Sequence, residues 1–209
     1  MAEECRDVLD GGADLLHLDV MDGHFVPNLT MGVDMCCALR RHLPRVYLDV
    51  HLMVEQPAQY VEPFADAGAN LLSFHLEAMP NDDGEEATAL IERIHACGVS
   101  AGLVINPLTP PDGLERFVKQ VELMLVMSVH PGRSGQKFIP DVLAKTRWIA
   151  ERIGPGTRLQ MDGGLNIDTA PRAVAAGVDV LVTASALFGA DDRASVIEDF
   201  HAIESGEKS

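Results

Sequence analysis

The sequence predicts an α/β fold, a (β/α)8 TIM barrel in which short buried strands alternate with amphipathic helices. Three observations lead to this prediction. Seven runs of apolar and β-branched residues recur along the chain, which is typical of parallel strands buried on both faces. A longer amphipathic stretch follows most of these runs. The predicted strands cover residues 15–22, 47–53, 71–77, 100–106, 123–129, 158–162 and 180–185.

The predicted helices alternate with these strands, and several of them begin at a proline. They cover residues 2–10, 34–42, 57–67, 85–97, 111–120, 140–153 and 169–176. The third observation is a glycine between a helix and the next strand, where it ends the helix in the left-handed conformation. Such joints stand at Gly12, Gly68 and Gly177, with a looser copy at Gly98. They predict repeated units within a single domain over residues 1–209.

The predicted barrel lacks its first strand, because the chain begins directly with the predicted helix over residues 2–10. A closed barrel of this kind needs eight strands, and the sequence supplies seven. The gap would leave two unpaired strand edges, which favours association of copies into a homo-oligomer. An open doubly wound sheet is the alternative, but no GxGxxG motif follows the first strand.

The composition restricts the partners of the protein. The chain has 32 acidic and 16 basic residues and a formal charge of -16, which argues against binding to nucleic acid or to an anionic membrane. Any phosphate site must therefore act locally, through backbone N–H groups or a nearby arginine. The four cysteines form no CxxC pair, and no apolar run is long enough to span a membrane. We expect a soluble, cytoplasmic protein.

Titratable side chains gather at the carboxyl ends of the predicted strands, where barrels of this kind place their active sites. His17 and Asp19 alternate in the first strand, His51 lies in the second, and Asp162 ends the sixth. Alternation places His17 and Asp19 on one face. Two imidazoles and two carboxylates make a plausible four-ligand site for one divalent metal ion, Zn²⁺, Fe²⁺, Mn²⁺ or Co²⁺.

Each of these residue types also has a purely structural interpretation. A single histidine in a strand is more often a hydrogen-bonded core residue than a metal ligand. Asp22 and Asp49 could instead hold loops or neighbouring side chains. His75 could line the site or lie in the core. No lysine falls in a predicted strand, which disfavours a Schiff-base aldolase and an Asp-x-Lys-x-x-Asp decarboxylase.

Three loops after the last predicted strands are candidates for phosphate binding. The phosphate site of many barrels lies at this position, beside the final strands. A glycine-rich loop alone is weak support, because glycine also simply makes turns. The candidate residues are Gly132, Arg133, Ser134 and Gly135, then Gly163 and Gly164, and finally Ala184 and Ser185.

Several motifs closely resemble the signatures of the ribulose-phosphate 3-epimerase family, in the order in which the family has them. The longest reads Leu-His-Leu-Asp-Val-Met-Asp-Gly-His-Phe-Val-Pro-Asn over residues 16–28, and the second covers residues 49–54. A third lies at residues 127–138, followed by Asp-Gly-Gly at 162–164 and Ser-Ala at 185–186. The family is a (β/α)8 barrel that interconverts D-ribulose 5-phosphate and D-xylulose 5-phosphate, so the resemblance implies this fold and this activity.

The resemblance also implies roles for individual residues. It implies an acid/base pair that moves the C3 proton through a cis-enediolate, and a metal ion that stabilises the developing oxyanion. The implied metal ligands are His17, Asp19, His51 and Asp162, and the implied acid/base pair is Asp19 and Asp162. The implied pocket floor is Met21, Met53 and Met127. His51, residues 132–135, Gly163, Gly164, Ala184 and Ser185 match contacts to the phosphorylated ketose.

The chain departs from the family pattern in three places. The family's first strand, with its substrate-binding serine, is absent, so the domain is N-terminally truncated relative to the family. The phosphate loop usually reads Gly-Phe-Gly-Gly-Gln, whereas residues 132–136 read Gly-Arg-Ser-Gly-Gln, and Arg133 could pair with the phosphate or face solvent. Ala184 replaces a common glycine. Two alternatives therefore stay open: a 3-epimerase of a ketohexose 6-phosphate such as allulose 6-phosphate, and an inactive paralogue that still binds sugar phosphate.

Overall fold

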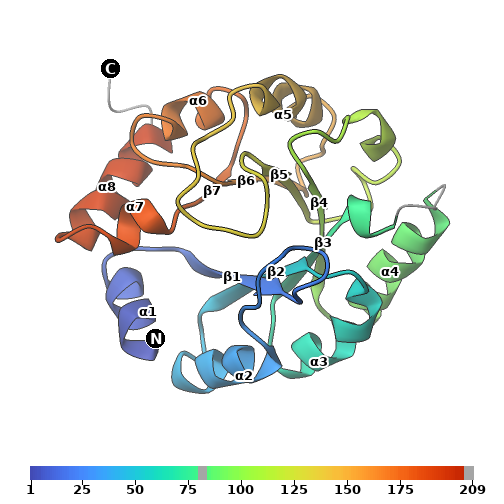
Figure 1. Cartoon of the computed structure of the whole chain (residues 1–209), viewed down its shortest axis with the longest axis horizontal. Coiled ribbons are helices and arrows are strands. Elements are labelled where there is room, and N and C mark those ends of the chain that lie inside the picture. Colours follow the sequence, from blue (N-terminus) through green and yellow to red (C-terminus); the bar gives the residue numbers. More distant parts are fainter. Residues whose placement is uncertain (80–83, 205–209) are drawn as a thin grey trace.

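The strands form a nearly closed parallel barrel inside a ring of helices in the computed structural model, which describes residues 1–79 and 84–204 (Figure 1). Within these residues, seven strands pair in chain order, each parallel to the next. The predicted barrel architecture is confirmed. The strands are β1 (Leu15–Met21), β2 (Tyr47–Met53), β3 (Leu71–His75), β4 (Ser100–Ile105), β5 (Leu123–Met127), β6 (Arg158–Asp162) and β7 (Val180–Val182).

Most of the helices lie between consecutive strands and cover the outside of the barrel (Figure 1). None of them, within the described residues, combines the length and the apolar character that a membrane-spanning helix needs. The α-helices are α1 (Ala2–Asp10), α2 (Val33–His42), α3 (Val61–Asp66), α4 (Glu85–Ala96), α5 (Val142–Ala150), α6 (Ala170–Val174), α7 (Ser185–Phe188) and α8 (Arg193–Glu204). The 3-10 helices are η1 (Pro57–Tyr60), η2 (Leu76–Ala78) and η3 (Asp112–Leu114).

The strand register separates the barrel interior from the outer core. Residues paired directly across parallel strands project to the same side, so the pairs His17–Asp49 and Asp19–His51 both belong to the interior. Apolar side chains on the outward face of the strands pack against the helices and form the main core. The interior on the β3–β5 side is filled by an apolar cluster of Leu71, Val104, Leu123, Leu125, Met127 and Val129.

The glycine joints predicted from the sequence are confirmed. Gly12, Gly68, Gly98 and Gly177 have φ angles of 109°, 96°, 74° and 97°, the left-handed region that favours glycine. Each one follows a helix and leads within a few residues into the next strand. These joints set the point at which each strand enters the barrel, and therefore which residues reach its carboxyl end.

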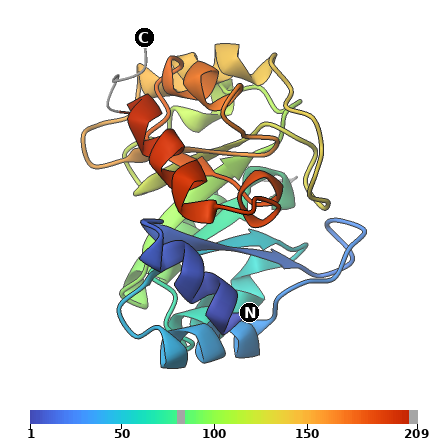
Figure 2. The ribbon, with the colours of Figure 1, turned by 90° about the vertical axis from the view of Figure 1, so that its left-hand side faces the viewer.

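A seam separates β1 from β7, because β1 pairs only with β2 and β7 only with β6 in the described part of the chain. Helices α1 and α8 lie on this side of the barrel (Figure 2). Arg193 of α8 joins them through ion pairs of 2.6 Å to Glu4 and 2.9 Å to Asp7. The prediction of a barrel without one strand agrees with this open seam.

The helix predicted over residues 111–120 is wrong. Only the 3-10 helix η3 and a series of turns form there, with i→i+3 hydrogen bonds from Leu114 N to Pro111 O and from Phe117 N to Leu114 O. Gly113, in the first turn of the predicted helix, is a poor helix former. Burial of Leu114 and Phe117 holds the segment in place instead.

The end of the chain differs from the prediction in two further ways. The sequence predicts the last strand over residues 180–185, but β7 ends at Val182, and Ser185 already begins α7. Helix α8 was not predicted at all.

The third strand is also shorter than expected, because the chain turns into η2 directly after His75. The predicted domain over residues 1–209 extends past the described residues, and its single-domain organisation stays a prediction.

Candidate active site

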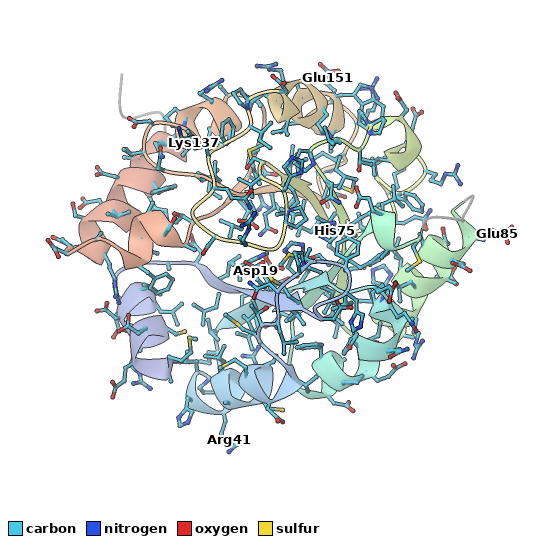
Figure 3. The ribbon with its side chains drawn as sticks, in the orientation of Figure 1. Asp19, Arg41, His75, Glu85, Lys137 and Glu151 are labelled. Carbon is cyan, nitrogen blue, oxygen red and sulfur yellow. The ribbon has the colours of Figure 1, made fainter. Side chains whose placement is uncertain are left out.

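Four predicted residues meet at the carboxyl ends of β1, β2 and β6. One side-chain donor atom from each of His17, Asp19, His51 and Asp162 lies within 4.8 Å of each of the others, and we call this group the His/Asp cluster. Figure 3 shows Asp19 near the barrel axis, whereas the labelled Arg41, Glu85 and Glu151 lie on the outside. The structure therefore brings together all four residues predicted to bind metal.

The two imidazoles each direct one nitrogen toward Asp19. The His17 Nε2 atom lies 3.3 Å from Asp19 Oδ1, and the His51 Nδ1 atom lies 3.0 Å from the same oxygen. The same two nitrogens are 3.4 Å apart. Two imidazole nitrogens and a carboxylate oxygen thus converge on one point, the arrangement that a single cation requires.

The outer nitrogen of each imidazole has a different partner. The His17 Nδ1 atom lies 2.7 Å from Asp49 Oδ2, which also accepts a hydrogen bond from Gln160 Nε2 at 2.8 Å. The His51 Nε2 atom lies 2.8 Å from Nε2 of His75. Asp49, Gln160 and His75 are all buried. The side chains that orient the cluster are therefore as enclosed as its histidines.

The two carboxylates of the cluster have opposite electrostatic environments. Burial raises the pKa of Asp162 to about 7, and the charges of Asp19 and Asp49 add to this increase. Burial also acts to raise the pKa of Asp19, but hydrogen bonds from His17 and His51 outweigh it and lower that pKa. Asp162 therefore favours its protonated form and Asp19 favours its ionised form, an asymmetry typical of acid/base pairs.

The histidines differ in the same way. Burial lowers the pKa of His51 to about 4, so its imidazole is neutral near pH 7. Burial also acts to lower the pKa of His17, but the carboxylates of Asp49 and Asp19 outweigh it and raise the value well above the ordinary 6.5. A neutral imidazole has a nitrogen lone pair available for a metal ion.

The residues present fit a divalent cation. The carboxylate of Asp162 has no hydrogen-bond partner within the described residues, although the side chain lies inside the barrel. Two neutral or neutralisable imidazoles and two carboxylates suit Zn²⁺, Fe²⁺, Mn²⁺ or Co²⁺. A cation at this point would also relieve the repulsion between Asp19 and Asp162 that raises the Asp162 pKa.

The predicted floor residues fall into two groups. Met21 and Met53 are paired across β1 and β2 and pack together with Val26 in one buried cluster. Met127 lies in a different apolar cluster and is paired with Asp162 across β5 and β6. All three methionines are buried at the same end of the barrel as the His/Asp cluster. Strand alternation places Met21 on the face of His17 and Asp19, and Met53 on the face of His51.

The predicted phosphate loops lie close to one another. Gly163 and Gly164 have positive φ angles, and a Cβ atom at Gly164 would come within 2.5 Å of the Phe138 backbone nitrogen. These two glycines therefore pack directly against the segment that contains the candidate phosphate loop at residues 132–135. Thr183 Oγ1 contacts the Leu165 carbonyl at 3.4 Å, which links the end of β7 to the same region.

The remaining candidates occupy exposed positions around this region. Arg133 and Ser134 are exposed, and Arg133 makes no ion pair within the described residues. Ala184 lines a cavity of about 800 Å³ along the seam, together with His17, Asp19 and Asp162. Ser185 is the first residue of α7. The contacts of these residues to a phosphate stay a prediction.

The structural interpretation of Asp22 and Asp49 is confirmed, and Gln160 is the supporting residue that sequence reasoning missed. Asp22 holds loops, as one interpretation expected, because its carboxylate accepts backbone hydrogen bonds from His24, Phe25 and Glu55. Asp49 holds a neighbouring side chain, His17, and shares this role with Gln160, which binds the same carboxylate oxygen. The signal was present in the sequence, because strand alternation places Gln160 on the same face as Asp162.

Solved structures share this barrel at low sequence identity. A 3-hexulose-6-phosphate synthase matches with a TM-score of 0.70 and 16% identity, covering 97% of this chain and 92% of that one. KGPDC from Streptococcus mutans matches with a TM-score of 0.71 and 13% identity, covering 100% of this chain and 94% of that one. These similarities support the fold alone.

Sequence relatives are much closer. The profile of the ribulose-phosphate 3 epimerase family matches residues 1–188. The ribulose-phosphate 3-epimerase of Bacillus subtilis (strain 168) is 43% identical over 205 residues, covering 95% of this chain and 91% of that protein. A cytoplasmic isoform from Oryza sativa subsp. japonica is 42% identical over 200 residues, covering 94% of this chain and 85% of that protein. The chain therefore belongs to the ribulose-phosphate 3-epimerase family, a family of isomerase-class carbohydrate epimerases.

Proposed function

We propose that this protein epimerises D-ribulose 5-phosphate to D-xylulose 5-phosphate at C3, with one divalent metal ion in the His/Asp cluster. The observation that carries the proposal is the convergence of Asp19 and Asp162 from well-separated strands of the barrel. Epimerisation needs one group on each face of a planar intermediate, and carboxylates from β1 and β6 would supply these two groups. The names of the relatives support the substrate.

The chain's own carboxylates move the proton. One aspartate removes the C3 proton, which lies α to the C2 carbonyl, and leaves a cis-enediolate. The other aspartate returns a proton to C3 from the opposite face, and the reverse reaction exchanges the two roles. The metal ion, when bound, supplies positive charge that stabilises the developing oxyanion. His17 and His51 would hold that ion and take no part in proton transfer.

The surroundings of the cluster favour this chemistry. Met21 and Met53 present a buried apolar surface that would exclude water from the enediolate and limit its unwanted protonation. The backbone N–H groups of residues 132–135 and of Gly163 and Gly164 would bind the phosphate, with Arg133 as an added cation. Such local contacts are needed because the net charge of -16 repels a phosphorylated substrate.

The test is an epimerase assay on metal-depleted protein to which Zn²⁺, Fe²⁺, Mn²⁺ or Co²⁺ is added back. We expect activity only after metal addition. Asp162→Asn should lower kcat by about 10²-fold to 10⁴-fold, the contribution typical of a general acid or base, while the circular dichroism spectrum stays unchanged. Asp10→Asn removes the same charge at an exposed position of α1 and should retain full activity. Near-normal turnover in Asp162→Asn would rule out its acid/base role.

Two alternatives predict different results in the same assay. Higher kcat/KM on allulose 6-phosphate than on D-ribulose 5-phosphate would identify a ketohexose-phosphate 3-epimerase. A folded protein that binds Zn²⁺ but turns over neither sugar would be an inactive paralogue, as the altered loop at residues 132–136 and Ala184 could produce. The homo-oligomer and the cytoplasmic location stay predictions, to be checked by analytical ultracentrifugation and by cell fractionation.

A further inference from the structure

A chain of hydrogen-bonding side chains leads from His51 to a carboxylate outside the His/Asp cluster. His51 Nε2 lies 2.8 Å from Nε2 of His75, and Nδ1 of His75 lies 3.2 Å from Oε2 of Glu77. His75 is fully buried at the end of β3, and Figure 3 shows it in the barrel interior near Asp19. None of these atoms has a role in the proposed reaction, so their arrangement needs its own explanation.

Glu77 is fixed in place by the loop after β4. Its Oε1 atom accepts a hydrogen bond of 2.8 Å from the backbone N–H of Asn106 and another from the Thr109 hydroxyl. Lys145 holds the same loop from α5, because its Nζ donates to the carbonyls of Asn106 and Pro107 at 3.0 and 2.7 Å. With Oε1 occupied by two donors, the free Oε2 is directed at His75.

The protons of these side chains can be assigned by elimination for the state in which a cation occupies the His/Asp cluster, because Asp19 would then face the cation and need no proton from Nδ1 of His51. A carboxylate only accepts hydrogen bonds, so Nδ1 of His75 must donate to Oε2 of Glu77. A His75 that carries a single proton, on Nδ1, has a lone pair on Nε2 that accepts from Nε2 of His51. This leaves the Nδ1 atom of His51 without a proton, so its lone pair would face the cation beside Asp19, which lies 3.0 Å away. In metal-free protein the Asp19 carboxylate instead draws a proton to this nitrogen.

We propose that Glu77, acting through His75, is a positioning residue that holds His51 in the tautomer whose Nδ1 lone pair faces the metal position. The inference rests on the metal site of the proposed function but not on the epimerase reaction. Metal-binding histidines commonly donate their second ring N–H to a carboxylate or a carbonyl, which fixes the ring. Here a second imidazole lies between the histidine and the carboxylate.

The substitution Glu77→Gln should reverse the direction of the hydrogen bonds that join Glu77, His75 and His51. In Glu77→Gln, the amide oxygen must take the place of Oε1, because Asn106 N–H and the Thr109 hydroxyl both donate there. The amide NH₂ group then faces His75 and donates to its Nδ1. His75 must carry its proton on Nε2 instead, and His51 is driven to the Nδ1–H tautomer. That proton occupies the nitrogen that would bind metal.

The experiment combines two measurements on wild type, on Glu77→Gln and on the control Glu115→Gln, which removes the same charge at an exposed position. Long-range ¹H–¹⁵N spectra of Zn²⁺-loaded wild type and of metal-free Glu77→Gln report which nitrogen of each imidazole carries the proton. Competition with a chelator reports the affinity for Zn²⁺ alone. We expect His75 to be protonated on Nδ1 in wild type and on Nε2 in Glu77→Gln, with Zn²⁺ affinity about 10-fold to 100-fold lower.

Each outcome decides the proposal. A Zn²⁺-loaded wild type in which His75 is protonated on Nε2 overturns it without any variant, so a Glu77→Gln protein that fails to fold does not prevent the test. Equal Zn²⁺ affinity of wild type and a folded Glu77→Gln also overturns it and leaves His75 with a packing role. If the tautomers and affinities change as expected but wild type lacks epimerase activity, the proposed reaction fails and this inference stands.

Discussion

The two imidazoles of the His/Asp cluster are held by carboxylates in different ways. His17 contacts Asp49 directly, and both residues are paired across neighbouring strands inside the barrel. We call this contact, together with Gln160, the direct arm. His51 reaches Glu77 only through His75, and we call this chain the relay arm. The direct arm is built from the sheet itself, whereas the relay arm leaves the sheet at His75 and ends at a loop.

Because of this difference, the two arms should contribute differently to the stability of the fold and to metal binding. The direct arm joins β1, β2 and β6 across the barrel interior, so a change there should disturb the fold and the site together. The relay arm depends on η2 and on the loop that contains Asn106 and Thr109, which contribute less to the barrel itself. A change in the relay arm should therefore alter metal binding more than it alters stability.

The largest effect is expected from breaking the direct arm with Asp49→Ala. The buried His17 and Gln160 side chains would both lose their acceptor, and unsatisfied buried groups cost about 1 to 3 kcal/mol each. We expect the free energy of unfolding, measured by urea denaturation of metal-free protein, to fall by about 3 kcal/mol. Zn²⁺ affinity should fall as well.

Asp49→Asn is the matched control for this substitution. Its amide oxygen can take the place of Oδ2 and still accept from His17 and from Gln160, because both donors meet at that one atom. We therefore expect most of the stability to return. Equal losses of stability in Asp49→Ala and Asp49→Asn would show that the charge, rather than the accepted hydrogen bonds, holds the direct arm.

An intermediate effect is expected from loosening the far end of the relay arm with Lys145→Met. The substitution removes the hydrogen bonds from Nζ to the carbonyls of the loop after β4, and we expect the protein to lose about 2 kcal/mol of stability. Amide hydrogen exchange of the loop at Asn106 and Thr109 should become faster. Zn²⁺ affinity should fall less than in Glu77→Gln, because Glu77 keeps its charge and its oxygens.

A greater loss of Zn²⁺ affinity in Lys145→Met than in Glu77→Gln would contradict this ranking. Lys119→Met is the control for the removal of a lysine charge, because Lys119 is exposed and lies outside both arms. Its stability and its Zn²⁺ affinity should match those of wild type within error.

The His/Asp cluster could be predicted from the sequence, but the hydrogen bonds of the two arms that support it could not. Histidine and aspartate at alternate positions of an apolar strand identify one face, and the barrel architecture brings the carboxyl ends of strands together. Gln160 and Asp49 are 111 positions apart in the chain, so their hydrogen bond depends on the register of every strand between them. Local pattern carries no information on that register.

The same limit applies to the relay arm and to the wrongly predicted helix. Glu77 lies two positions after His75, yet its orientation is set by Asn106 and Thr109 from the next βα loop. The segment over residues 111–120 has an amphipathic spacing, but tertiary burial of its apolar residues is compatible with turns as well as with a helix. In both cases contacts between distant segments decide the local structure.

The smallest expected effect is a pH dependence that the relay arm contributes to stability. Burial acts to raise the pKa of Glu77, but hydrogen bonds from His75, Asn106 and Thr109 outweigh it and lower the value below the ordinary 4.5. His75 and Lys145 are the charged or titratable groups that face this carboxylate. A lowered pKa means that the ionised group stabilises the fold above pH 4.5 and that this stabilisation is lost as the pH falls through the lower folded value.

Glu77→Gln removes this contribution at every pH. We therefore expect metal-free wild type to be more stable than Glu77→Gln near neutral pH, with a difference that shrinks as the pH falls below 4.5. Urea denaturation of both proteins, measured from about pH 6 to about pH 3, provides the comparison. Glu115→Gln should follow the wild-type curve. A difference that stays constant over this range would mean that the Glu77 carboxylate is not held by its hydrogen bonds, and the relay arm would then have no fixed end.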